Sequence, residues 1–486
     1  MAKTPNFNTE IPAKIMTPDR VFTRLGDLEF FDGMPTDATA ATLLDHLSFL
    51  RGVEVFLNTV QVASLEAVRV GLAEVGATAA NKVVIYDNLM DSNSLFLTGN
   101  TDTVYAIAIL ELDRDGPTVV EIPPGSGPGT VDDAWFRFVV DMGAPGPDRG
   151  QGGKYLILPP GYDAEVPEGY FVAQSTSFVN LVLLRGFVVD GSTQAASQMF
   201  RNGVKIYPLD RKDDPPTTEF ISGSGLVFNT IHPNTFEFYE ELHRIIDREP
   251  VAIIDPETRG LMAAIGIRKG KPFAPDEHAR EILTDAVAVG NATARSIFFQ
   301  TNVPDNYLYE GSYWKRGFFG GDYRFLLDGD EGAGERNLDA RTALFYMATL
   351  NTPAMTMKMV GAGSQYAWGD RDSSGNYLDG AKSFRLTLPP NVPAKNFWSV
   401  VVYDPQTRSE LQTGQLYPSK SSQTGEIEEN PDGSIDLYFG PEAPQGHESN
   451  WIQTVPGKGW FTLLRLYGPL EPWFDQTWRP GEFDLV

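Results

Sequence analysis

Residues 100–105 bring together side chains that acid–base chemistry uses. The segment is Asn-Thr-Asp-Thr-Val-Tyr, and it opens a long apolar run that predicts a strand over residues 103–112. Alternation along a strand sends Asp102 and Tyr105 to opposite faces. A carboxylate, an amide and a phenol at the mouth of a strand could bind or activate a polar ligand. Asn100 and Asp102 also suit Asx-turns, so a purely structural turn is the alternative interpretation.

Two further ionisable residues belong to predicted strands of the same half of the chain. Asp141 ends one strand, and Arg185 lies inside an otherwise apolar one. We predict that Asp102 or Asp141 acts as a general base. Tyr105 or Arg185 would then be the orienting or electrophilic group. A buried structural ion pair is the competing explanation for the two charged residues.

Tryptophans gather in the second half of the chain, and stacked aromatic rings beside carboxylates suit sugar rings or hydrophobic small molecules. Trp398 and Trp460 stand in strand patterns, which predicts core positions. Trp314, Trp368 and Trp451 lie near predicted loops, so we expect them at the surface or in a cleft. With Asn100 they are the predicted ligand-binding residues.

One loop has the oxygen spacing of a calcium site. Residues 370–375 are Asp-Arg-Asp-Ser-Ser-Gly, so Asp370, Asp372 and Ser374 alternate before a glycine that permits a tight turn. The bidentate glutamate of an EF-hand is replaced by Ala381. An ordinary turn entering a strand is the alternative. No other cofactor is predicted.

Common catalytic signatures are missing from the sequence. It has no G-x-S-x-G, H-E-x-x-H, Walker A or G-x-G-x-x-G motif, and it has no cysteine. Common serine hydrolases, zincins, P-loop enzymes and Rossmann enzymes are therefore disfavoured, and so are disulfides, thiolate nucleophiles and cysteine metal sites.

The net charge of the chain disfavours two classes of partner. It carries 64 acidic and 39 basic residues, a formal net charge of -25, which repels nucleic acid and anionic membranes. No run approaches the ~18 apolar residues of a membrane helix, and the first residues lack the apolar core of a signal peptide. We expect a soluble protein without membrane insertion.

At 486 residues the chain is long enough for two or three domains. We predict an extended lead over 1–36, a helix with a first β-sandwich module over 37–225, a helical connecting segment over 226–365, and a C-terminal β-sandwich module over 366–486. The predicted class is α+β, mainly β, with two antiparallel β-sandwich or jelly-roll-like modules joined by helices.

Period-two alternation and Pro/Gly-rich turns define the strands of both modules. The first module has predicted strands over 83–86, 103–112, 118–122, 135–141, 154–158, 169–175 and 181–189. The second has predicted strands over 384–388, 397–403, 435–439 and 460–467.

Helical periodicity marks the remaining elements. Thr36-Asp37 is a plausible N-cap for a helix that carries Leu43, Leu44, Leu47 and Leu50, and this helix should lie against a sheet.

Three more helices are predicted in the connecting segment. Asn234 can cap the first, which runs to about Glu249, and the second begins near Asp276. The third covers about residues 341–349.

The chain resembles a two-module bacterial family catalogued as paired domains of unknown function, numbered twelve fifty-four and twelve fourteen. The N-terminal resemblance rests on residues 100–105, 110–113, 116–117 and 153–161. The C-terminal resemblance rests on residues 377–380, 389–390, 396–400, 450–452 and 464–469. The resemblance implies two jelly-roll-like modules with helices between them, in proteins often exported to the periplasm or beyond. It implies no activity and no catalytic residue.

Three functional hypotheses remain. The first is a hydrolase or lyase that acts on a polar small molecule or glycan in a cleft between the modules. The second is a non-catalytic exported binding protein, or a toxin-like effector, that recognises a glycan or a host surface. The third is a structural protein that self-assembles as a homo-oligomer.

Overall fold

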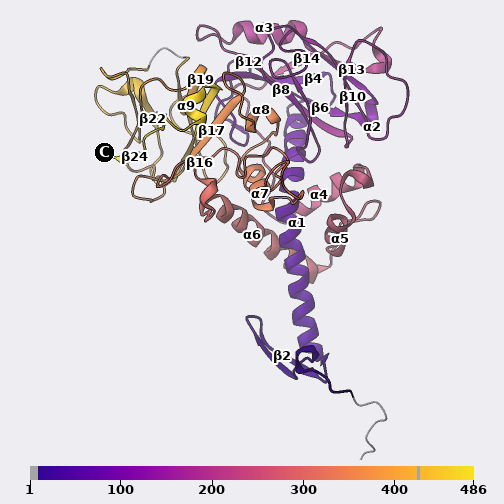
Figure 1. Ribbon diagram of the computed structural model, residues 1–486. Coiled ribbons are helices and arrows are strands. Elements are labelled where there is room, and N and C mark those ends of the chain that lie inside the picture. The colour runs from indigo at the N-terminus through magenta and orange to yellow at the C-terminus, as the bar shows by residue number, and fades with distance from the viewer. Residues whose placement is uncertain (1–8, 424–426) are drawn as a thin grey trace, which may run out of the picture.

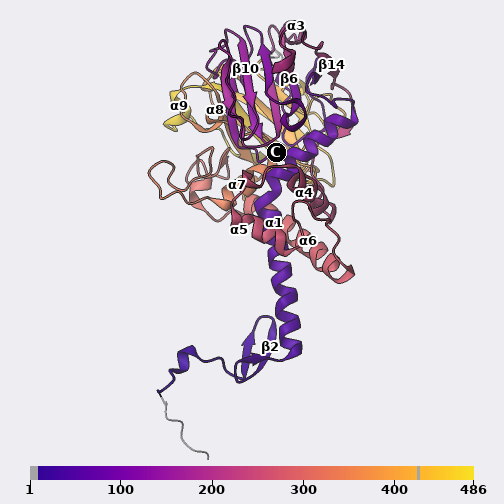
Figure 2. The same cartoon turned by 90° about the vertical axis from the view of Figure 1, so that its right-hand side faces the viewer.

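The computed structural model describes residues 9–423 and 427–486, and shows a body of sheets and helices from which a long helix projects (Figures 1 and 2). The class is α+β and mainly β, as predicted. Within the described residues most strand pairs run antiparallel, and four pairs at sheet edges run parallel.

The N-terminal module consists of two packed sheets. Its strands are β4 (Lys82–Ile85), β6 (Thr103–Glu111), β7 (Thr118–Ile122), β8 (Gly129–Asp133), β9 (Phe138–Met142), β10 (Gly153–Leu158), β11 (Phe171–Gln174), β12 (Val179–Phe187), β13 (Lys205–Pro208) and β14 (Glu219–Ser222). One sheet has the order β14-β4-β6-β12-β8-β9 and the other β11-β10-β7-β13. Val104 and Leu184 from the first sheet share an apolar core with Val120 and Ile157 from the second.

The C-terminal module repeats this two-layer arrangement. Its strands are β16 (Lys315–Arg316), β17 (Ser364–Gly369), β18 (Phe384–Leu388), β19 (Ala394–Tyr403), β20 (Ser419–Ser421), β21 (Ile435–Gly440), β22 (Trp451–Gln453), β23 (Phe461–Pro469) and β24 (Phe483–Leu485). The orders are β16-β17-β23-β19-β20 and β22-β21-β18-β24. Val400 and Leu464 of one sheet pack with Leu386 and Leu437 of the other.

A third and larger core joins the modules. Its helices are α1 (Asp37–Glu74), α4 (Glu237–Arg248), α5 (Pro256–Ala264), α6 (Glu277–Phe299) and α7 (Leu338–Met347). Leu65 of α1 belongs to the same buried cluster as Ile107 and Leu183 of the N-terminal module and Leu463 of the C-terminal module. One face of each module's sheet therefore packs on the helical layer. Shorter elements complete the chain: α2 (Leu112–Asp115), α3 (Gln194–Gly203), α8 (Pro353–Thr356), α9 (Glu471–Phe474), β5 (Ser94–Leu95) and β15 (Phe228–Asn229).

From Ala13 onward the N-terminal lead is folded, contrary to the prediction of an extended segment, and residues 1–8 lie outside the described residues. It forms a three-stranded sheet of β1 (Arg20–Thr23), β2 (Gly26–Phe31) and β3 (Met34–Pro35) at the start of α1, away from the body (Figures 1 and 2). We call residues 9–50 the arm.

The first half of α1 also differs from the prediction. Leu44, Leu47 and Leu50 are 63%, 38% and 42% exposed, so this stripe does not lie against a sheet. The helix continues far beyond the predicted stripe, and its residues are continuously buried only from Thr59 to Val68. By length and composition α1 could cross a membrane, which the search for uninterrupted apolar runs missed. In the fold, 78% of its most apolar 18-residue window is buried, which is the burial expected of a core helix.

Other boundaries shift for local reasons. The predicted strand over 135–141 is a turn followed by β9, because Asp133 accepts hydrogen bonds from the amides of Trp135 (2.8 Å) and Arg137 (3.0 Å). Asn234 is not the cap of α4, whose N-cap is Phe236. The cap of α6 is Asp276, as predicted, and it accepts from the amide of Ala279.

Helices α1 and α6 approach each other closely at Gly52 and Gly290. This close approach can be tested by substitution. A Cβ at Gly290 would lie 2.8 Å from Phe56 Cδ1 and 2.9 Å from its Cβ. Gly290→Ala should therefore lower the free energy of unfolding by about 1–3 kcal/mol through overpacking. Gly260→Ala in α5 is the matched control, because nothing lies within 4 Å of its added Cβ. It should be neutral or raise stability by about 0.5–1 kcal/mol. Urea unfolding measures both, and equal effects would contradict the close crossing.

Candidate functional site

The N-terminal side of the candidate site is a cross-strand pair. Tyr105 of β6 lies opposite Arg185 of β12 in an antiparallel register. On both strands the inward positions further along are aliphatic, for example Ile107 and Leu183, which belong to the shared core. The face thus changes from aliphatic to polar toward one end of the sheet.

The C-terminal side of the candidate site also consists of polar side chains on neighbouring strands. Arg465 of β23 lies opposite Tyr366 of β17 on one side and Ser399 of β19 on the other. Tyr467 follows two residues later, on the same face, and Leu463 precedes Arg465 in the apolar core. A row of polar side chains therefore crosses three strands where the two modules meet.

A small cavity of ≈ 40 Å³ lies between the two polar rows. Its walls include Tyr105, Arg185, Tyr366, Arg465 and Tyr467. We call it the inter-module cavity. It is large enough for a few water molecules or a small anion.

Segment 98–102 ties the N-terminal module to the C-terminal one. Asp102 Oδ2 accepts hydrogen bonds from Ser399 Oγ (2.5 Å) and Tyr467 Oη (3.4 Å). Arg465 Nη2 donates to the carbonyl of Thr98 (2.7 Å), and Tyr403 Oη donates to that of residue 99 (2.5 Å). These hydrogen bonds join the two modules. We call the residues that make them, Asp102, Ser399, Tyr403, Arg465 and Tyr467 with the carbonyls of residues 98 and 99, the polar seam.

Asn100 has two roles in this seam. Its Oδ1 accepts from the amides of Asp102 (2.9 Å) and Thr103 (3.1 Å), the Asx-turn geometry that the structural interpretation anticipated. Its Nδ2 donates to Tyr105 Oη at 2.5 Å. Asn100 also lines the inter-module cavity, so it both closes a turn and orients a phenol there.

Arg185 is a buried cation that forms no direct ion pair with a carboxylate of the described residues. It is 9% exposed, its Nε has no hydrogen-bond partner, and Asp141 acts on it at longer range across a shared cavity. Burial lowers the pKa of its guanidinium, but the surrounding phenols of Tyr105 and Tyr366 counteract this, and the pKa ends above its ordinary value. The charge therefore persists without a described carboxylate in direct contact. A buried, unpaired charge is costly, and an anion in the cavity would relieve that cost.

Asp141 approaches Arg185 from a second, smaller cavity of ≈ 20 Å³ that both residues line together with Thr352. Burial raises the pKa of Asp141 to about 7, although Thr352 and Arg185 counteract the rise. Its Oδ1 has no hydrogen-bond partner. A carboxyl group that titrates near neutral pH beside a cation has the properties of a general base.

Asp102 is placed differently from Asp141. It lies in the seam but is not among the residues that line either cavity. Burial raises its pKa, against the opposing effects of Arg465 and Ser399. Of the two predicted bases, the geometry thus favours Asp141, and it assigns Asp102 to the contact between the modules.

The tryptophans are mostly structural. Trp314 and Trp368 were predicted at the surface or in a cleft, and at 1% and 3% exposed neither lies at the surface. Both indoles point inward, where their Nε1 atoms donate to backbone carbonyls at 2.8 and 3.1 Å. Trp368 does line the inter-module cavity. Trp451 is half-buried in β22 and donates to the carbonyl of residue 440.

The side chains of the predicted calcium loop make other interactions. Asp370 forms a buried ion pair of 2.6 Å with Lys315. Asp372 Oδ1 accepts from the amides of Ser374 (2.9 Å) and Asn376 (2.8 Å), as in an ordinary turn. Over residues 9–423 and 427–486, no group of three or more acidic or histidine side chains has the arrangement of a metal site.

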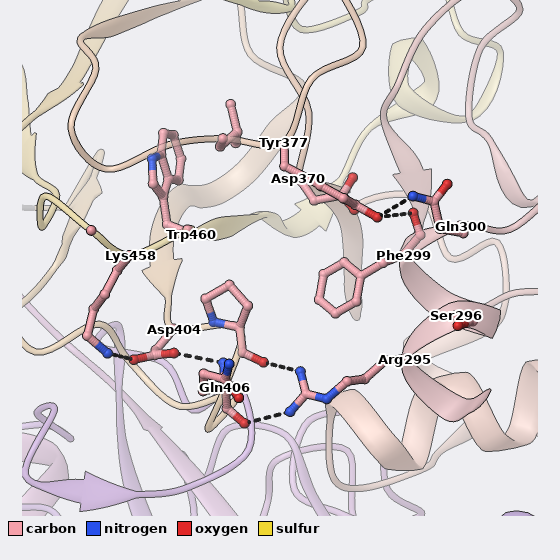
Figure 3. A pocket seen from close by; sticks show the side chains of 14 residues that line it. Arg295, Ser296, Phe299, Gln300, Asp370, Tyr377, Asp404, Gln406, Lys458 and Trp460 are labelled. Atoms are coloured by element: carbon pink, nitrogen blue, oxygen red, sulfur yellow. Dashed lines mark hydrogen bonds and ion pairs between the residues drawn. The ribbon is translucent and has the colours of Figure 1, made fainter. Parts of the chain in front are cut away.

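A larger groove lies between the end of α6 and the C-terminal module (Figure 3). It has a volume of ≈ 440 Å³ and an apolar wall that includes Phe299 and Trp460. Lys458 pairs with Asp404, and Arg295 donates to the carbonyl of Pro405. Among the described residues, Asp370 Oδ1 and Trp460 Nε1 have no hydrogen-bond partner, so the groove combines surface for an apolar body with two unpaired polar atoms.

Sequence reasoning found one side of the site and missed the other. Asn100, Tyr105, Asp141 and Arg185 all line the cavities. Tyr366, Arg465 and Tyr467 were not singled out. A signal was available, because Arg465 interrupts an apolar strand in the same way as Arg185.

Comparisons with known proteins place these elements in two described domains. Residues 80–208 match the model described as Protein of unknown function (DUF1254), and residues 363–471 match Protein of unknown function (DUF1214). Their order confirms the predicted pairing. No protein with a curated description matches the chain.

A solved structure with a TM-score above 0.5 shares the fold. The VPA0106 protein from Vibrio parahaemolyticus is 16% identical, with a TM-score of 0.55 over 90% of this chain and 100% of its own. An uncharacterized protein from Burkholderia cenocepacia is 12% identical, with a TM-score of 0.41 over 92% of this chain and 97% of its own. The similarity to the Vibrio parahaemolyticus protein supports the fold and implies no activity.

The raised pKa of Asp141 predicts a pH-dependent stability. Its ordinary pKa is 3.8, so the unfolded chain loses this proton near pH 4, whereas the folded chain keeps it to about pH 7. Between these values the folded state binds more protons. Asp141 should therefore lower the free energy of unfolding by about 1.4 kcal/mol for each pH unit through this window.

Asp141→Asn should remove this contribution. The free energy of unfolding of the variant, minus that of the wild type, should rise from pH 4 to pH 7 and stay level above pH 8. Urea unfolding across this range measures the difference, in which other titrating groups cancel. Asp214→Asn, at a side chain that is 94% exposed, is the control and should give a flat difference. A flat difference for Asp141→Asn as well would refute the raised pKa.

Proposed function

We propose that this chain, which belongs to the family that pairs the DUF1254 and DUF1214 domains, is a lyase or hydrolase for a small carboxylate-bearing molecule. The reaction takes place beside Arg185, which lines both the inter-module cavity and the smaller cavity that Asp141 lines. The observation that carries this proposal is Arg185, a buried guanidinium without a carboxylate partner that faces two cavities. Guanidinium groups bind carboxylates with matched planar geometry.

The neighbours of Arg185 supply the chemistry. Asp141, with a pKa of about 7, takes a proton from the carbon next to the bound carboxylate. Arg185 stabilises the negative charge that develops on the carboxylate oxygens. The electron pair of the broken C–H bond then forms a double bond and expels a leaving group from the adjacent carbon. The phenol of Tyr105, oriented by Asn100, is the group that protonates this leaving group.

The size of the cavity favours a small substrate over a glycan. At ≈ 40 Å³ it is well below the ~300 Å³ that drug-sized ligands usually occupy. A sugar chain would require the modules to separate, against the bonds of Asp102 and Arg465 across the seam. An exported location remains a prediction from the family resemblance.

A second function, self-assembly, is supported by the arm. Nine large apolar side chains between residues 9 and 50 are more than a third exposed: Ile11, Ile15, Met16, Phe22, Phe31, Met34, Leu44, Leu47 and Leu50. Together they present on the order of 1,000 Å² of surface, comparable to the ~800 Å² that each partner buries in a stable complex. The net charge of -25 opposes an anionic membrane as the partner. We therefore propose a second copy of the chain, paired arm to arm.

The catalytic proposal is tested by ligand-induced stabilisation. Small mono- and dicarboxylates should raise the melting temperature of the wild type, whereas the corresponding amides should not. Arg185→Met keeps most of the apolar stem of the side chain and should abolish the shift, while Arg185→Lys should retain part of it. An equal shift in the Met variant would contradict the assignment of Arg185.

The acid that binds best is then followed by proton NMR for conversion. Asp141→Asn should keep binding and lower turnover by about 10²–10⁴-fold, the usual contribution of a general base. Binding without any conversion by the wild type would favour the non-catalytic hypothesis over the enzyme.

Self-assembly is tested by light scattering. The full chain should be a dimer, and the double variant Phe22→Ser and Phe31→Ser should be monomeric because both rings are about three-quarters exposed. Val227→Ser, at a residue 81% exposed outside the arm, is the matched control and should stay dimeric. A wild type that is monomeric at high concentration would exclude this role.

A further inference from the structure

A wide cleft lies beside α7, and it shares no described lining residue with the inter-module cavity. It has a volume of ≈ 520 Å³ and is formed by the turn between β8 and β9, the start of α5, the loop over residues 323–336, and α7. Aromatic side chains make much of its wall: Trp135, Phe136, Phe138, Tyr323, Phe325 and Phe345. We call it the arginine cleft, because four arginines also line it.

Two of these arginines are neutralised within the protein. Arg137 Nε forms an ion pair of 2.7 Å with Asp133. Arg324 pairs with Asp322 at 2.8 Å and with Asp330 at 2.7 Å. Their positive charge is therefore matched by carboxylates of the same region.

The other two have no carboxylate partner among the described residues. Arg336 donates only to the carbonyl of Arg324. Arg341 Nη2 donates to Asn58 Oδ1 (2.7 Å), and its Nε is buried without a hydrogen-bond partner. Burial, and then the nearby charge of Arg336, lower the pKa of Arg341 to about 10. The positive charge of Arg336 thus disfavours the charged form of Arg341.

We propose that the arginine cleft binds an organic anion with an apolar body, whose carboxylate or sulfonate group lies between Arg336 and Arg341. Such a group satisfies the buried Nε of Arg341 and relieves the repulsion between the two guanidinium groups. The aromatic wall receives the apolar body. The single acidic residue in the lining, Asp255, is engaged as the N-cap of α5, where its Oδ1 accepts from the amide of Thr258.

Volume and charge together define the ligand class. A cleft of ≈ 520 Å³ lies within the usual range of small-molecule sites, ~300–1,000 Å³. Two unmatched cations in a chain of net charge -25 select for an anion over a neutral molecule of the same shape. This site is separate from the inter-module cavity and does not rest on the function proposed for Arg185.

The fluorescent probe 8-anilinonaphthalene-1-sulfonate tests the site, because it combines an aromatic body with an anion. The wild type should bind it with enhanced fluorescence, and 4-phenylbutyrate should displace it while 4-phenyl-1-butanol should not. Arg336→Gln should weaken binding of the probe about tenfold, as for the loss of one charge-assisted contact. Arg341→Lys should weaken it less, because the charge remains.

Arg211→Gln is the matched control. It removes one positive charge from a side chain that is 55% exposed and outside the cleft, and it should leave binding unchanged. Arg336 is exposed, so its replacement should not unfold the protein. Equal affinities of Arg336→Gln and Arg211→Gln, or equal displacement by the acid and the alcohol, would overturn the proposal. Retained binding in Arg336→Gln would instead favour the apolar groove beside Trp460 as the probe's site.

Discussion

The apolar core around the second half of α1 is the constraint on which the rest of the structure depends. Each module has a core of its own, yet each also turns one sheet face outward, and the two faces meet on the same helical layer. Burial of these faces fixes the modules relative to each other. The glycines at positions 52 and 290 permit this by letting α1 and α6 approach closely.

The polar seam follows from where that core ends. Ile107, Leu183 and Leu463 pack against the helices, and the next inward positions on the same strands are Tyr105, Arg185 and Arg465. Because strand alternation forces these side chains inward, they can reach solvent only if the modules part. Their polar atoms must be satisfied by each other or by something small between them. Arg465 is satisfied in part by backbone carbonyls, but Arg185 is not.

Sequence patterns predicted the strands well because period-two alternation reflects burial directly. They predicted the arm and the first half of α1 poorly, since an apolar stripe such as that of Leu44 and Leu47 indicates burial only if a partner is present. Trp314 was misplaced for a related reason: it lies outside a regular strand, yet β16 and the C-terminal residues cover it. The site was half predictable, because an arginine inside an apolar strand is visible in the sequence, whereas the opposing strand that completes the cavity is known only from tertiary structure.

This acidic chain buries arginines that have no direct carboxylate partner in the described part of the chain. Anions that enter a cavity can bind these arginines, whereas the negative surface repels anions that stay outside. At physiological salt the field of the surface carboxylates extends over a Debye length of about 8 Å, so it weakens loose binding of anions to the exterior. Inside a cavity the local dielectric is lower, and a close guanidinium dominates the interaction. Arg185 and Arg341 are both shielded from the surface charge in this way, one by the seam and the other by an aromatic wall. The difference between the two sites then lies in volume: the first accepts little beyond the charged group itself, whereas the second has room for the apolar body attached to it.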